Sequence, residues 1–218
     1  QRQMCIRDSL NFLRCALLSF AGAALMLLVP AAGAAEIDAG SGLPSYEELP
    51  AQAPDEALLK PLAAKSLKGR FEERRSLPGL PKPMVTTGVF ELTGKIFRWE
   101  AEKPFSSVMT AGPDGVVMEA AGERQVLSAA DIPAVGRVSE LLSGVFSGNF
   151  AALKEAFDLR AEKLADGSVR IAARPKSPEL AKVLGEVRAK GRSFVERIEV
   201  VSAQGRTEIL FSDVSGER

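Results

Sequence analysis

Hydrophobic and polar residues alternate along much of the chain after residue 70. The alternation is clearest over residues 88–93 and 96–102, which a Gly-Lys dipeptide at 94–95 separates. In the second run Phe97 and Trp99 fall on one face, and both neighbours of Trp99 are charged. A period of two is typical of a strand with one buried face, and a short turn containing glycine joins antiparallel neighbours. These residues therefore predict a β-hairpin.

The same pattern predicts further strands, paired by turn sequences such as Gly-Pro-Asp-Gly at 112–115. They are expected at residues 105–110, 115–120, 157–162, 169–173, 194–202 and 206–212. Residues 71–77 also alternate, but charges occupy both faces, so we expect an edge strand or an early strand there. Residues 180–188 fit either a helix or a strand.

A helical period is found near the N-terminus of the folded part. Asp55 and Glu56 can cap a helix that runs to about Leu67, with Gly69 as its stop. Pro61 interrupts this helix or marks its true start, because proline is tolerated only in the first turn.

A second helical region lies in the middle of the chain. Asp131 caps a helix whose apolar stripe extends to Phe146, and Asn149 caps a shorter helix that follows. Gly144 and Gly148, at the ends of this pair, are either hinges or simple helix ends.

These elements together predict an α+β fold. We expect one curved antiparallel sheet of about nine to eleven strands, with the N-terminal helix and the helical pair on one side. A sheet of this size curls, so helices over its concave face would enclose an apolar space. The periodicity is equally consistent with a core filled by its own side chains.

The N-terminus carries the pattern of an export signal. Residues 17–29 are uncharged and mostly apolar, Arg14 precedes them, and Ala32 and Ala34 have the spacing that signal peptidase recognises. The run is shorter than the roughly 18–20 residues that cross a bilayer. We expect cleavage after Ala34 or Ala35 and a mature protein in the periplasm.

This signal sets the expected domain boundaries. Residues 1–35 form the signal peptide, although residues 1–9 do not fit its pattern and are left out of the fold prediction. Residues 36–54 are rich in Gly, Pro, Ser and Glu and predict a flexible leader. The folded domain is expected over residues 55–218.

Composition narrows the chemistry of the mature chain. After residue 35 there are 25 basic and 27 acidic residues, a balance that disfavours nucleic acid as a partner. The chain has no histidine, and its two cysteines lie at positions 5 and 15. Disulfides, the usual zinc sites and His-dependent catalysis are therefore not expected. We predict a protein that is not an enzyme and needs no cofactor.

The most specific motif lies in the first hairpin. It reads Gly-x-Phe-x-Leu at 88–92, then Phe-x-Trp at 97–99 and a proline at 104. With the export signal and the mid-chain helical pair, this pattern resembles the outer-membrane lipoprotein carrier family (LolA-like proteins) of Gram-negative bacteria. The resemblance covers residues 57–213, and the chain is similar to a divergent member.

The resemblance implies a fold and a function. LolA-like proteins are unclosed half-barrels covered by helices on the concave side, and they act as soluble periplasmic chaperones. They bind the acyl chains of a lipoprotein or lipid in an apolar cavity and ferry them toward the outer membrane. An inner-membrane exporter, an outer-membrane acceptor and a monomeric state are implied by the same resemblance. Members usually continue beyond the last strand, which leaves room for a further piece after Arg218.

The resemblance also suggests site residues, with the helical pair at 132–153 as the lid. The expected cavity residues are Phe90, Leu92, Phe97, Trp99, Met109, Met118, Leu141, Leu142, Phe146, Ile171, Ile198, Val200, Ile209 and Phe211. The family carriers hold the lid with an arginine just before the aromatic strand. That position falls at Thr93, Gly94 or Lys95, so the latch is either Lys95 or absent.

A second function remains open on the same fold. The chain could be a lipid-sensing or assembly-scaffold protein without a transport role. A sensor should bind a protein partner in a lipid-dependent way, whereas a carrier should release its lipid to an acceptor membrane.

Overall fold

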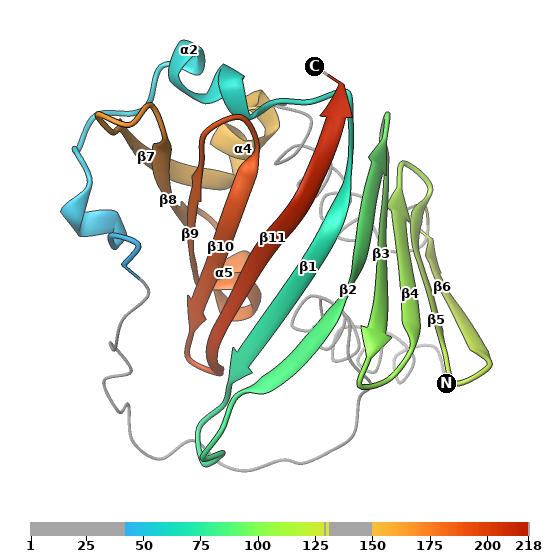
Figure 1. Cartoon of the computed structure of the whole chain (residues 1–218). Coiled ribbons are helices and arrows are strands. Elements are labelled where there is room, and N and C mark those ends of the chain that lie inside the picture. The colour runs from blue at the N-terminus through green and yellow to red at the C-terminus, as the bar shows by residue number, and fades with distance from the viewer. Residues whose placement is uncertain (1–41, 129, 131–149, 218) are drawn as a thin grey trace.

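Eleven strands form one antiparallel sheet that is not closed (Figure 1). The computed structural model describes residues 42–128, 130 and 150–217. The strand order is β6-β5-β4-β3-β2-β1-β11-β10-β9-β8-β7, so β6 and β7 lie at the two edges. We call the face that carries the buried aromatic residues of β1, β2 and β3 the inner face, and the opposite face the outer face.

Each strand pairs with the next one along the chain, except β6 and β7, and helix α5 connects β8 to β9. Their bounds are Ser66–Ser76 (β1), Met84–Thr93 (β2), Ile96–Lys103 (β3), Ser107–Gly112 (β4), Gly115–Ala120 (β5), Glu123–Ser128 (β6), Phe157–Lys163 (β7), Val169–Pro175 (β8), Glu186–Gly191 (β9), Val195–Ser202 (β10) and Gly205–Glu217 (β11). The helical elements are Tyr46–Glu48 (η1), Glu56–Leu59 (α2), Lys60–Leu62 (η2), Phe150–Ala156 (α4) and Pro178–Leu184 (α5).

The predicted hairpins are confirmed, with small shifts at their ends. The pairs β2–β3, β4–β5, β7–β8 and β10–β11 are all antiparallel. Strand β6 was not predicted, because four of its six residues are exposed and it lacks a clear apolar alternation. The ambiguous stretch at 180–188 contains both structures, since α5 ends at Leu184 and β9 begins at Glu186.

Residues 71–77 were expected to form an edge strand or an early strand. Strand β1 is the first strand in the chain, but it lies in the middle of the sheet, between β2 and β11, so the edge alternative was wrong. On the outer face Glu72 pairs with Arg74, and on the inner face Glu73 pairs with Arg75, each at 2.6 Å. The charges on both faces are therefore neutralised within the strand. A sequence with charges on both sides can then occupy a central position.

The predicted helix at 55–67 is much shorter in the structure. Asp55 caps α2 as expected, because its carboxylate accepts a hydrogen bond from the Ala57 N–H at 3.2 Å. Pro61 has no N–H to continue the α-helical ladder, and the chain tightens into the 3-10 turn η2. Leu67 and Gly69, expected at the end of the helix, belong instead to β1.

Part of the expected flexible leader packs on the outer face of the sheet. The ring of Tyr46 lies 4.1 Å from the Arg160 guanidinium carbon and 4.6 Å from that of Arg174. Leu43 and Leu49, which precede and follow Tyr46 in the sequence, are both buried. The structure differs from the expectation because the partners come from β7 and β8, more than 100 residues away in the sequence.

The described helices pack against one end of the sheet. Side chains of α2, η2 and α4 cluster with Ala161 and Val169, and those of α4 and α5 cluster with Phe157 and Leu159. The predicted lid helix at 131–146, with Gly144 and Gly148, lies outside the described residues. A helical cover over the whole concave face is therefore not confirmed. In the described part of the chain, none of the helices has the length and hydropathy needed to span a bilayer.

Gly88 is predicted to be essential for the β2–β3 pairing. A Cβ atom at this position would overlap the carbonyl oxygen of Glu100. We expect Gly88→Ala to lower the free energy of unfolding by about 1–3 kcal/mol, as overpacking does. Gly112→Ala is the matched control, because its Cβ would first meet Ile96 at an ordinary 3.8 Å. Equal urea-unfolding midpoints for the two variants would contradict the close approach.

Tyr46 is predicted to fasten the N-terminal segment through its ring face. Two cation–π contacts contribute about 0.5–1 kcal/mol each at exposed sites. Tyr46→Ala should therefore lower the free energy of unfolding by about 1–2 kcal/mol, measured by urea denaturation. Tyr46→Phe keeps the ring and should stay within about 0.5 kcal/mol of wild type. If the alanine variant is as stable as the phenylalanine variant, the segment is not held in this way.

Candidate functional site

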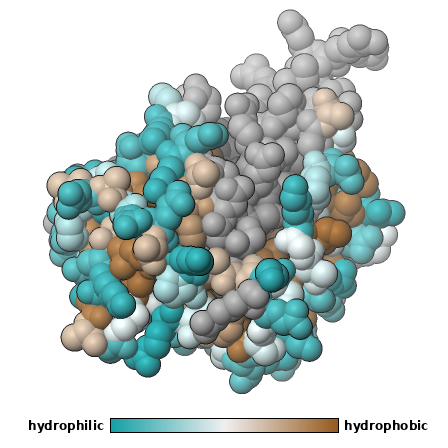
Figure 2. Space-filling model, turned by 90° about the horizontal axis from the view of Figure 1, so that it is seen from above, coloured by the Kyte–Doolittle hydropathy of each residue, from teal (hydrophilic) through white to brown (hydrophobic). Residues whose placement is uncertain are grey.

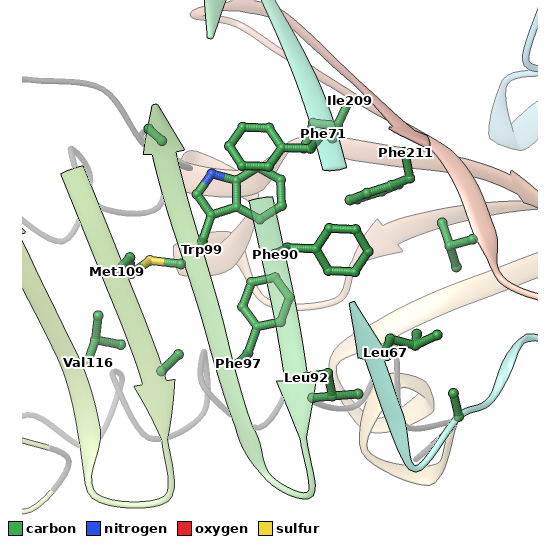
Figure 3. Packing of buried hydrophobic residues seen from close by; sticks show 14 of the residues in the cluster. Leu67, Phe71, Phe90, Leu92, Phe97, Trp99, Met109, Val116, Ile209 and Phe211 are labelled. Atoms are coloured by element: carbon green, nitrogen blue, oxygen red, sulfur yellow. The ribbon is translucent and has the colours of Figure 1, made fainter. Parts of the chain in front are cut away.

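The inner face of the sheet carries a continuous apolar surface (Figure 3). Because side chains alternate across a strand, every second residue of β1 to β5 and of β11 points to this side. The surface contains fifteen buried residues in one cluster, with Trp99 and Phe97 fully buried. Its members come from strands at both ends of the sequence, and the pairing of β1 with β11 brings them together.

Trp99 lies at the centre of an aromatic group. Its ring stacks on Phe71 with centroids 3.7 Å apart and an interplanar angle of 24°. Phe97 and Phe90 lie tilted at 5.9 and 6.4 Å, and Phe211 meets Trp99 edge to face at 6.2 Å. Aromatic pairs with such geometries are stabilised beyond the burial of their area. The group is therefore a rigid apolar platform built from four strands.

The apolar surface extends from this platform toward one edge of the sheet. One row runs across four strands, where Phe90, Trp99, Met109 and Met118 lie directly opposite one another in turn. A second row of directly opposed residues, two positions away along the strands, reaches the edge strand β6. It consists of Leu92, Phe97, Ala111, Val116 and Leu127. The register thus aligns apolar residues over the full width of this half of the sheet.

The structure brings together nine of the fourteen predicted cavity residues, seven of them buried. Those buried in the main cluster are Phe90, Leu92, Phe97, Trp99, Met109, Ile209 and Phe211, and Met118 and Ile198 pack against it half-buried. Ile171 lies in a separate cluster with Leu59 and Leu62. Val200 is half-buried in β10 and is in none of the clusters. That these side chains line a cavity stays a prediction.

The remaining site predictions fall outside this surface. Leu141, Leu142 and Phe146 lie outside the described residues. Lys95 is exposed in the β2–β3 turn, and its role as a lid latch stays a prediction because the lid is not described. Sequence reasoning missed Phe71, although its alternation with the charged residues of β1 was a usable signal.

A buried ion pair lies beside the aromatic group on the inner face. Glu73 is 2% exposed, and its carboxylate accepts a hydrogen bond from Arg75 at 2.6 Å. Ile209 lies directly opposite Glu73 on β11. Burial raises the pKa of Glu73 to about 7, although the positive charge and the hydrogen bond of Arg75 act in the opposite direction. Desolvation therefore outweighs the pairing.

Two pockets found in the structure lie away from the aromatic group. One of about 740 Å³ is formed by the β3–β4 loop and the β5–β6 turn, with Phe105 in its wall. Another of about 370 Å³ is lined mainly by the outer side of β1, β2 and β3, and Lys68 and Arg98 contribute to it. Six of the ten residues that line the second pocket are charged, and the wall of the first contains Glu119, Glu123 and Arg124.

The chemistry available on the inner face is that of binding. The residues of its main buried cluster are all apolar. The polar residues of this face include the Glu73–Arg75 pair and the half-buried Thr86 and Thr207, which lie opposite Glu73 and Arg75. No group of three potential metal ligands is found within residues 42–128, 130 and 150–217. Seen from above, hydrophilic residues dominate much of the outside, and hydrophobic patches lie among them (Figure 2). The arrangement can hold an apolar molecule against aromatic and aliphatic side chains.

Comparisons with known proteins find likeness only among solved structures. No protein-family model matches the chain, and no curated protein does. The chain is similar to a LolA superfamily protein from Nitrosomonas europaea, with 10% identity, a TM-score of 0.39, and coverage of 75% of this chain and 93% of that one. The family named from the sequence is thus represented among the matched structures.

Two further solved structures are similar to the same extent. A DUF1329 family protein from Desulfovibrio piger has 8% identity and a TM-score of 0.40, covering 74% of this chain and 91% of that one. The Mycobacterium tuberculosis lipoprotein LppX has 11% identity and a TM-score of 0.38, covering 74% and 96%. At these identities and TM-scores, none of the three assigns a function to the chain.

The buried carboxyl of Glu73 gives a test of the site's electrostatics. Its pKa rises from 4.5 to about 7 on folding, so the unfolded chain releases this proton more readily. Wild type should therefore lose about 3 kcal/mol of stability relative to Glu73→Gln as the pH rises from about 4.5 to about 7, with no further change above. Urea unfolding at several pH values measures this difference.

Glu72→Gln removes an exposed carboxylate from the outer face of the same strand and controls for the change in net charge. A stability difference between wild type and Glu73→Gln that is constant over this pH range would contradict the assignment.

Proposed function

We propose that this protein is an exported carrier that binds the acyl chains of a lipoprotein or lipid on its inner face and ferries them toward the outer membrane. The observation that supports this most is the continuous apolar surface on one side of an open sheet. The export signal expected at residues 1–35 fits a protein that works between two membranes.

The energetics of the inner face suit an acyl chain. Each methylene group removed from water contributes about 0.8 kcal/mol, so a 16-carbon chain contributes on the order of 10 kcal/mol. An unshielded chain would lose this free energy in crossing an aqueous space. Because Trp99 and Phe97 are fully buried, a chain reaches them only when the packing over the inner face opens. Uptake and release are therefore coupled to that opening.

A binding role suits the residues better than catalysis. The chain contains no histidine, and its only cysteines are at positions 5 and 15. The buried acidic group of the inner face, Glu73, is held in an ion pair with Arg75. Apolar binding with release by a conformational change requires none of these groups.

Trp99 provides a direct test, because it is the only tryptophan in the chain and lies at the centre of the apolar surface. A brominated acyl chain quenches tryptophan fluorescence only at close contact. We expect a brominated stearate to quench Trp99 in a saturable manner. The unbrominated chain should bind in competition and relieve the quenching. Titration of the purified protein, followed by fluorescence, measures both effects.

Two substitutions on β5 locate the binding surface. Met118 is on the inner face opposite Met109, and Val117 is on the outer face of the same strand. Both are half-buried, so they are matched for exposure. Met118→Asp places a charge against the chain and should weaken binding at least tenfold, whereas Val117→Asp should leave it within about twofold. Saturable quenching that neither variant alters, or no quenching of Trp99, would contradict the proposal.

A further inference from the structure

The sequence Phe-Glu-Glu-Arg-Arg at 71–75 builds the same ion pair twice, once on each face of β1. Glu72 and Arg74 pair on the outer face, where their side chains are 37% and 48% exposed. Glu73 and Arg75 pair on the inner face, where they are 2% and 17% exposed. An outer ion pair in solvent contributes little to stability. The inner pair is buried against an apolar surface, where a charged pair is costly to desolvate.

The inner pair leaves two polar atoms without partners. A guanidinium and a carboxylate can form two parallel hydrogen bonds, but here only Arg75 Nη2 and Glu73 Oε1 are joined, at 2.6 Å. Glu73 Oε2 and Arg75 Nε are buried and have no hydrogen-bond partner among the described residues. One is an acceptor and the other a donor. Buried polar atoms in native proteins are nearly always paired, so these two call for an explanation.

The two open atoms have complementary requirements. Glu73 Oε2 accepts a hydrogen bond, and Arg75 Nε donates one. A secondary amide offers both counterparts on adjacent atoms, since its N–H donates and its carbonyl oxygen accepts. An ester carries the carbonyl oxygen but has no N–H. The pair can therefore distinguish an acyl chain attached through an amide from the same chain attached through an ester.

The position of the pair fits the polar end of an acyl chain. Glu73 is two residues from Phe71, which is about 7 Å along a strand, and Phe71 stacks on Trp99. Ile209 of the apolar cluster lies opposite Glu73. Arg75 follows two residues later and is more exposed. A chain lying on the aromatic group would thus place its linkage at Glu73 and Arg75 and its headgroup nearer to solvent.

We infer that Glu73 and Arg75 recognise the amide linkage of an N-acylated ligand whose chain lies on the apolar inner face. This inference rests on the proposed function, because it assumes that the inner face binds acyl chains. It specifies the chemical class of the ligand, because the preferred ligand carries its acyl chain on an amide nitrogen. The source is either an N-acylated protein terminus or an N-acyl lipid.

The test compares ligands that differ only in the linkage. N-methyldodecanamide and methyl dodecanoate are titrated against the full mature protein at about pH 8, with Trp99 fluorescence as the readout. We expect wild type to bind the amide at least about tenfold more tightly than the ester, as a hydrogen bond to a charged group provides. A dodecanoyl tripeptide separates the two sources. Binding tighter than the simple amide identifies a protein terminus, and weaker binding identifies a lipid.

A double substitution removes the recognition group and leaves an apolar wall. Glu73→Leu with Arg75→Leu should bring the amide and ester affinities within about twofold of each other, with ester binding retained. Replacing a buried ion pair by apolar residues is often neutral for stability, so this variant is expected to fold. Glu72→Leu with Arg74→Leu makes the same change on the outer face and should keep the wild-type preference.

The outcomes separate the two proposals. Equal affinity of wild type for amide and ester overturns the inference and leaves the proposed function standing. A preference that persists in the Glu73/Arg75 double variant also overturns the inference. The wild-type comparison decides the question even if that variant does not fold. Failure of wild type to bind either ligand overturns both the inference and the proposed function.

Discussion

The antiparallel pairing of β1 with β11 joins the first and last strands of the chain in the middle of the sheet. The apolar inner face depends on this pairing. Residues 66–76 pair with 206–217, and Phe71 lies directly opposite Phe211. Without this pairing, strands β1 to β6 and strands β7 to β11 would form two separate sheets. The aromatic group would lose Phe211, its member from β11, and the apolar surface would be divided. The pairing therefore creates both the width of the sheet and the continuity of its inner face.

The parts of this fold that could be predicted from the sequence are local. The hairpin of β2 and β3 follows from alternation around Trp99 and a glycine turn, both contained within about 15 residues. The central position of β1 could not be predicted, because its partner β11 is far away in the sequence and its charges imitate an edge strand. The segment around Tyr46 was predicted to be flexible for a similar reason. The two arginines that contact its ring are far from it in the sequence.

For the candidate site, too, only the local features could be predicted from the sequence. The residues of β2, β3 and β4 on one face could be listed from their period of two, and they do meet in one cluster. Glu73 could not be distinguished from Glu72, because adjacent glutamates in an alternating strand look alike until the buried face is known. The rings of Phe71 and Trp99 pack with their centroids 3.7 Å apart, as in a filled core. The proposed carrier function requires that this surface also open to an acyl chain.

Native mass spectrometry of the gently purified protein would show whether the inner face holds an acyl chain. We expect a species heavier than the protein chain by the mass of an acyl-bearing molecule, and we expect this molecule to be released when the protein is denatured. A spectrum that contains only the bare chain, both from fresh preparations and after incubation with acyl ligands, would rule out acyl binding on the inner face. The identity of the released molecule would also reveal whether its chain is attached through an amide.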